Sequence, residues 1–222
     1  MFAFLNLKDM IIRFLFLFLI FSGSVFAQTQ QQTRKYYGDK ESEYVEGSPY
    51  LFDDFRTATI LDKSGQLFND FKVKYNLFTQ EAIFMNKEGV VEKFGNPLSE
   101  IRIKNLGTFK NGYANPMYGT SNTLYEVLFK DKLELLKLNV KKIEDGPLGY
   151  NDAHPPKKYV SETKYYLIIN NKWVEVTKSK KSLIKAFNDK ETLINEYISK
   201  NNLNISNQND LISLITYCNT LL

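Results

Sequence analysis

The stretch KYNLFTQEAIFMNKEGVVEKF, residues 74–94, shows how most of this chain is built. It reads as two β-rich runs around a turn at Asn86–Gly89, where glycine supplies the positive φ that tight hairpins favour. In the overlapping stretch FKVKYNLF, residues 71–78, apolar residues alternate with lysine and asparagine. A period of two is that of a half-buried strand. The stretch therefore predicts scaffold, with one apolar side facing a core.

The same pattern of strand, polar turn and strand fills residues 47–177. Further short turns are expected at Lys63–Gly65, Lys130–Lys132 and Asn170–Asn171. Because short turns pair neighbouring strands antiparallel, the sequence predicts a meander of about eight to ten strands. A meander of that size must curl, close on itself or have one face covered. An open sheet and a closed barrel both remain possible at this point.

Residues 178–222 change to a helical period and predict two to three short amphipathic helices. Their apolar faces are expected to hold Leu183, Ile184, Phe187, Leu193, Ile194, Tyr197, Ile198, Leu211, Ile212, Leu214, Ile215 and Cys218. We expect these helices to pack on the sheet within the same domain. The predicted fold class is thus mainly β (α+β), a curled antiparallel β-meander with a C-terminal helical cap.

The N-terminus has the pattern of a secretory signal. Lys8 and Arg13 precede the apolar run FLFLFLIF, and SGSVFAQ then predicts cleavage between Ala27 and Gln28. The alternative is a retained anchor, but the apolar segment is shorter than the roughly 20 residues that a spanning helix needs. We expect residues 1–27 to be a cleaved signal peptide, with Met1 or Met10 as its start. No stable transmembrane segment is expected after cleavage.

Residues 28–46 are polar and predict a flexible leader before the domain. The chain carries a net charge of +4, and its bases are dispersed except for KSKK at residues 178–181. That run favours a solvated helix entry, so no nucleic-acid partner is expected. A single cysteine excludes an intrachain disulfide, and 17 Phe and 14 Tyr make a large aromatic core plausible.

The sequence holds few of the residue patterns that catalysis needs. His154 is the one histidine, and no G-x-S-x-G motif supplies a nucleophile for it and Asp152. Zinc and calcium motifs and phosphate-binding glycine loops are missing. Strand carboxylates such as Glu81, Glu126 and Glu134 leave a glycoside hydrolase open, although solvated sheet faces explain them better. The sequence therefore predicts no catalytic residue, no cofactor and no metal.

Two irregular segments, residues 105–122 and 144–156, are rich in Gly, Asn, Pro and Tyr. Long aromatic loops on a β scaffold are common places for binding sites. We take Tyr113, Met117, Tyr118, Tyr150 and His154 as candidate residues for contact with a ligand or a partner. Ordinary connecting loops are the alternative.

The layout of the chain resembles a group of uncharacterised exported proteins of Bacteroidota-type bacteria. The resemblance rests on GSPYLFDDF, on KYNLFTQEAIF and on the helical tail that ends in SLITYCNTL, and it spans most of residues 47–221. Cys218 departs from it, because a second aromatic residue would be expected there. The resemblance implies a location in the cell envelope, and it carries over no functional residue.

Three hypotheses for the function follow. The first is a non-enzymatic binding or structural protein of the bacterial cell envelope, exported to the periplasm or outer envelope or secreted, with another envelope protein as its partner. The second is a carrier of a lipid or other apolar ligand inside the curled sheet. The third is a hydrolase, in which Asp152 and His154 would have to meet a Ser or Glu in one cleft.

Overall fold

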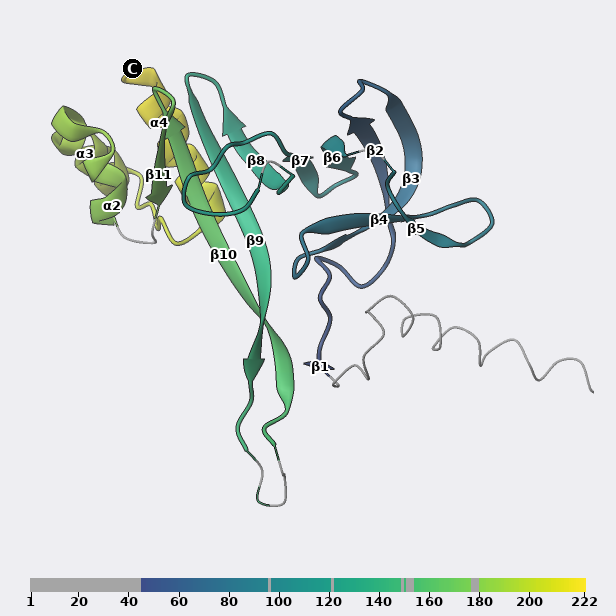
Figure 1. The fold of residues 1–222 in the computed structure, drawn as a ribbon. Coiled ribbons are helices and arrows are strands. Elements are labelled where there is room, and N and C mark those ends of the chain that lie inside the picture. Colours follow the sequence, from purple (N-terminus) through teal and green to yellow (C-terminus); the bar gives the residue numbers. More distant parts are fainter. Residues whose placement is uncertain (1–44, 96, 121, 149, 151–153, 177–179) are drawn as a thin grey trace, which may run out of the picture. The chain divides into compact units, whose positions relative to one another are not determined.

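The computed structural model describes residues 45–222, except for 96, 121, 149, 151–153 and 177–179. The expected signal peptide with Ala27 and Gln28, most of the expected leader, and Asp152 lie outside the described residues. The described strands are β1 (Val45–Glu46), β2 (Arg56–Asp62), β3 (Leu67–Asn76), β4 (Glu81–Met85), β5 (Val91–Lys93), β6 (Leu98–Ile103), β7 (Gly107–Lys110), β8 (Tyr125–Lys130), β9 (Leu133–Asp145), β10 (Lys157–Ile169) and β11 (Lys172–Val176). The helices are α2 (Lys180–Lys185), the 3₁₀ turn η2 (Asn188–Lys190), α3 (Glu191–Lys200) and α4 (Gln208–Thr220) (Figure 1).

The described strands form one mixed sheet that is not closed, in the order β1-β10-β9-β8-β7-β6-β2-β3-β4-β5, with β11 beside β10. Neighbours pair antiparallel, except that β1 runs parallel to β10. The predicted fold class is confirmed, because the protein is mainly β with three short helices at its C-terminal end. The strand order departs from a simple meander at two points, and the first is the pairing of β1 with β10. After β5 the chain crosses back, so that β6 pairs with β2.

The sheet curls far enough for the end of β3 to reach β9. The backbone N–H of Lys141 donates to the carbonyl of Leu77 at 3.0 Å, and the Lys141 ammonium bonds the carbonyl of Tyr50 at 3.1 Å. The Gln80 side chain bonds the carbonyl of Asn139 at 3.3 Å in the same region. Twisted antiparallel strands coil in this way without closing into a barrel.

Strand β9 is buried on both faces. Leu135 and Leu136 are fully buried although they are neighbours, and neighbouring side chains in a strand point to opposite faces. Leu135 joins a core with the helical residues Leu183, Ile194 and Leu214. Leu136 belongs to a second cluster that is covered by the connection between β7 and β8. A third cluster fills the apolar side of β2, β3 and β6.

The helices cover their part of the sheet much as the sequence predicts. Ile194 and Ile198 of α3 are buried, whereas Leu193 is 42% exposed. Cys218 is fully buried in α4, as expected for a small apolar residue, and burial raises the pKa of its thiol to about 12. Asn207 caps α4 by accepting from the backbone N–H groups of residues 209 and 210. Within the described part of the chain, every helix is too short or too polar to cross a bilayer.

Candidate functional site

The polar side of β3, β2, β6 and β7 holds the most developed candidate site. Strand β2 alternates, so Ala58 and Ile60 are buried in the core while Thr57 and Thr59 face the other way. Arg102 of β6 pairs with Thr59 on one side and with Thr108 of β7 on the other. Because cross-strand partners project to the same face, these three side chains form one row across the sheet.

A β-bulge shapes the neighbouring strand. Between the pairs Ala58–Phe71 and Ile60–Phe68 the register shifts, so that Asn69 and Asp70 both lie opposite Thr59. Asp70 adopts a positive φ of 57°, and the Thr59 hydroxyl lies 3.3 Å from the Asn69 side-chain oxygen. A bulge bends its strand and increases the local twist, which curves this face of the sheet.

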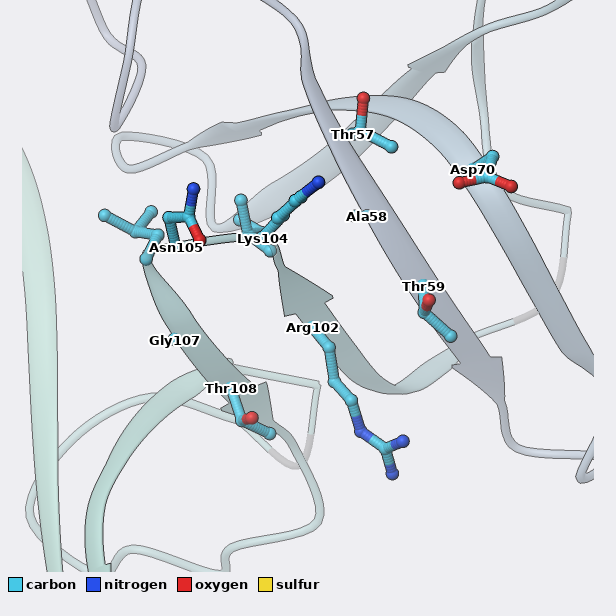
Figure 2. A pocket seen from close by; sticks show the side chains of 11 residues that line it. Thr57, Ala58, Thr59, Asp70, Arg102, Lys104, Asn105, Gly107 and Thr108 are labelled. Atoms are coloured by element: carbon cyan, nitrogen blue, oxygen red, sulfur yellow. The ribbon is translucent and has the colours of Figure 1, made fainter.

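A hollow of about 550 Å³ lies on this curved face. Its polar lining comes from Thr57, Thr59, Asp70, Arg102, Lys104, Asn105 and Thr108 (Figure 2). Figure 2 shows Lys104 reaching from the end of β6 toward Thr57, while Arg102 extends away from it past Thr59 and Thr108. The hollow thus offers hydroxyl groups between two cationic side chains.

Gly107 forms part of the wall of the hollow and has a backbone conformation that other residues rarely adopt. Gly107 begins β7 with a φ of 154°, and a Cβ atom at this position would lie 3.4 Å from the Glu126 carboxylate. Glu126 is itself buried and pairs with Lys137 at 3.1 Å. The Cβ atom would therefore have room beside this ion pair, and it is the φ angle of Gly107 that disfavours a side chain here.

Beside the hollow, Glu100 is a buried carboxylate with a side chain only 6% exposed. Lys110 lies 2.6 Å from it, and the Arg102 Nε also donates to it. Burial acts to raise the pKa of Glu100, but the hydrogen bonds and charges of Lys110 and Arg102 outweigh burial and hold the pKa below its ordinary value of 4.5. Glu100 therefore anchors Arg102 while the rest of the guanidinium, on a side chain that is 59% exposed, stays accessible.

Lys104 differs from Arg102 in its charged neighbours. It forms no ion pair with any residue that the structure describes, and the same holds for Asp70 across the hollow. Its backbone N–H donates to the Thr57 carbonyl at 3.3 Å, which fixes the start of its side chain beside β2. A ligand in the hollow would meet both charges without first displacing an ion pair.

Two of the predicted loop residues, Tyr113 and Tyr118, pack together in an aromatic cluster. Tyr113 contacts the rings of Tyr125 and Trp173 at centroid distances of 5.7 and 6.2 Å, and its hydroxyl donates to Glu134 at 2.9 Å. Burial raises the pKa of the Tyr113 phenol, and the carboxylate of Glu134 acts in the same direction. Tyr118 packs on the same cluster. Both residues thus cover the second face of β9.

The other three predicted loop residues are exposed. Met117 lies in the same loop as Tyr113 and is 45% exposed. Tyr150 and His154 lie in the connection between β9 and β10, where both side chains are open to solvent. The structure therefore divides the five residues between a packed cluster and two exposed places.

Among the described residues, no group of three His, Cys, Asp or Glu side chains is placed to hold a metal ion. The hollow is not predicted from the sequence. The two stretches that line it, TATI (57–60) and IRIK (101–104), do alternate between polar and apolar residues, as expected for strands with one polar face. What the stretches do not reveal is that they pair. No protein-family model, curated protein or solved structure matches this chain.

Proposed function

We propose that this chain is an exported, non-enzymatic binding protein of the bacterial cell envelope and that the hollow beside β2, β6 and β7 is its ligand site. The observation that carries the proposal is the hollow itself, which has about 550 Å³ of space and a lining of threonine, asparagine and charged side chains. That volume lies within the roughly 300–1,000 Å³ of small-molecule sites. The signal-like N-terminus supports export.

The lining favours a polar ligand with several hydroxyl groups. The Thr57 hydroxyl, which accepts from Lys72, can still donate. The Thr59 hydroxyl, which donates to Asn69, can still accept. The Thr108 hydroxyl and the Asn105 amide can donate and accept, and Asp70 accepts. A short saccharide presents the matching groups at similar spacing. An acyl chain would cover the charged Asp70 and Lys104 without offering either a hydrogen-bond partner, which is costly. We therefore favour a saccharide-like ligand over the apolar cargo of a lipid carrier.

The test compares two threonines whose hydroxyl groups each face an asparagine side chain on the neighbouring strand. The hydroxyl of Thr59 faces Asn69 at 3.3 Å at the hollow, and that of Thr163 faces Asn139 at 3.0 Å on the long β9–β10 hairpin. Thr59→Phe fills the hollow, and Thr163→Phe makes the same change far along the sheet. Both positions lie in strands, where phenylalanine is tolerated. Thermal unfolding should show that both variants fold.

Native mass spectrometry of the protein purified from its own envelope fraction provides the readout. We expect a discrete small-molecule adduct on the wild type and on Thr163→Phe, and none on Thr59→Phe. An adduct that survives Thr59→Phe would place the ligand elsewhere and overturn the assignment of the hollow. A bound protein in place of a small molecule would favour the interaction role, with the exposed Met117, Tyr150 and His154 as the first residues to substitute.

A further inference from the structure

We infer that the ligand of the hollow is an anion, a sugar ring bearing an oxyanion, and that Lys104 is the residue that pairs with its charge. This inference rests on the proposed function and names the chemical class of the ligand. It starts from the distribution of charge across the face described above.

One row of side chains across the sheet carries two lysines and no carboxylate, namely Lys72, Thr57 and Lys104. Lys72 of β3 pairs with Thr57 of β2, and its ammonium donates to the Thr57 hydroxyl at 2.8 Å. Lys104 lies on the other side of Thr57, where its backbone N–H meets the Thr57 carbonyl. Two strand spacings separate the two lysines, about 10 Å between backbones. At this separation the two lysines repel each other only weakly through salt solution, but an anion bound between them would be attracted to both.

The neighbouring rows of described side chains on this face contribute no carboxylate that pairs with Lys104. Glu100 is the buried carboxylate of this face, and Arg102 and Lys110 already share it. Asp70 projects from the bulge of β3, on the far side of β2 from Lys104 (Figure 2). Four cationic groups therefore face two carboxylates. Of the cations, Lys104 is the one within the hollow that no described carboxylate engages.

The remaining lining determines what else the ligand must carry. Thr59 and Thr108 flank Arg102, and hydroxyl groups of a sugar ring can bond with both. Asp70 can accept from a sugar hydroxyl at the opposite rim. A carboxylate or a phosphate on the ring would then reach Lys104 as a charge-assisted hydrogen bond. The shared chemistry is an oxyanion on a hydroxylated ring.

Three probes distinguish the contribution of the ligand's charge to binding from that of its sugar ring: glucose, glucuronate and glucose-6-phosphate. Binding to the chain that starts at Gln28 is followed by the backbone amide signals of residues 57–59 and 102–108 in NMR titrations. We expect both anions to bind about tenfold more tightly than glucose. Raising the salt from about 0.02 M to about 0.2 M should weaken the anions and leave glucose unaffected. The tighter of the two anions distinguishes a uronate from a sugar phosphate.

Lys104→Gln is the decisive variant, and Lys200→Gln is its control. Lys200 is exposed at the end of α3, so its substitution changes the net charge equally and leaves the hollow untouched. We expect Lys104→Gln to weaken anion binding about threefold to tenfold and to leave glucose binding unchanged. Lys200→Gln should bind all three probes like the wild type.

The outcomes separate this inference from the proposed function. Anions that bind no better than glucose, or a Lys104→Gln variant that keeps full anion affinity, would overturn the inference. So would the failure of all three probes to shift the amides of the hollow. The binding role of the hollow would still stand in these cases if Thr59→Phe removes the native adduct. If Thr59→Phe leaves that adduct in place, both proposals are wrong.

Discussion

Asn219, in the last turn of α4, donates from its side-chain amide to the carboxylate of Asp131 in the β8–β9 turn at 2.8 Å. The amide oxygen of the same residue accepts from the backbone N–H of Leu133 at 3.1 Å. Asn219 is buried, so one side chain satisfies two groups of the turn and fixes the helix against the sheet. The helical cap is therefore held by directional bonds as well as by apolar packing.

Substituting Asn219→Ala should destabilise the fold by about 1–3 kcal/mol, because the buried N–H of Leu133 would lose its partner. Chemical denaturation of the protein measures this loss. Asn209→Ala, at an exposed position in the same helix, is the control and should change stability by less than about 0.5 kcal/mol. Equal effects of the two substitutions would show that the bonds to the turn contribute little.

Tyr166 and Tyr125 should respond in opposite ways to the loss of their hydroxyl groups. The Tyr166 hydroxyl is buried and makes no hydrogen bond of normal geometry in the described part of the chain. Burial raises its pKa to about 12, and the nearby Asn115 amide acts only to a small extent in the opposite direction. Tyr166→Phe should therefore leave stability unchanged or raise it by up to about 1 kcal/mol. Tyr125 donates to the Tyr118 carbonyl at 2.9 Å and accepts from Asn115 at 3.1 Å.

Tyr125→Phe removes both of those bonds and should cost about 1–2 kcal/mol. The two variants delete the same atom from neighbouring rings of one cluster, so the difference between their unfolding free energies isolates the hydrogen bonds. A loss of stability in Tyr166→Phe equal to that in Tyr125→Phe would mean that the Tyr166 hydroxyl has a partner in solution.

Glu100 should make the fold sensitive to acid. Its pKa is lower in the folded protein than in the unfolded chain, so its contribution to stability is present above the ordinary value of 4.5. That contribution is lost as the pH falls through the folded pKa, because the protonated acid no longer attracts Lys110 and Arg102. Glu100→Gln should cost about 1 kcal/mol at neutral pH, a figure kept low because both cations are partly exposed to solvent.

Urea unfolding between pH 7 and pH 3 provides the measurement for Glu100. The gap in stability between wild type and Glu100→Gln should shrink steadily below about pH 4.5. Glu88→Gln, in the exposed β4–β5 turn, serves as the control and should show no such gap. A gap that is constant with pH would mean that the charge of Glu100 is unimportant.

Alanine substitutions of two leucines in the helical cap should change the stability of the fold by very different amounts. Leu214 of α4 is fully buried against the sheet, so Leu214→Ala should cost about 2–5 kcal/mol through lost contacts and a cavity. Leu193 of α3 is 42% exposed, and Leu193→Ala should stay within about 0.5 kcal/mol because alanine also favours a helix. Thermal unfolding of both variants tests whether the cap packs as described.

The hairpin turns could be read from the sequence because each depends on neighbouring residues. Asn170 and Asn171 have positive φ angles of 49° and 60°, the conformation of a tight turn, and asparagine tolerates it. The apolar face of β3 was equally visible from its alternation. Asn76 was the exception, because it was expected on the polar face and is buried. Its side chain bonds the N–H groups of Phe78 and Thr79 at the end of the strand.

The candidate site needed information that no local pattern contains. The hollow exists because β6 pairs with β2, which joins Ala58 to Ile103 across the returning chain. The contact of Lys141 with Leu77 is likewise set by strands that lie far apart in sequence, whereas the bulge at Asp70 lies within the β2–β3 hairpin. The candidate loop residues were chosen by composition, which does not distinguish the packed Tyr113 from the exposed Tyr150.

The sequence by itself determined the β-rich class, the short turns and the amphipathic helices, because periodicity and turn chemistry act within a few residues. The tertiary structure alone decided that β9 is covered on both faces and that Lys104 and Thr59 line one hollow. The physical reason is that burial and electrostatic environment come from groups brought together by pairing between distant strands. A lysine in an alternating strand looks the same in sequence whether it faces open water or an unfilled site.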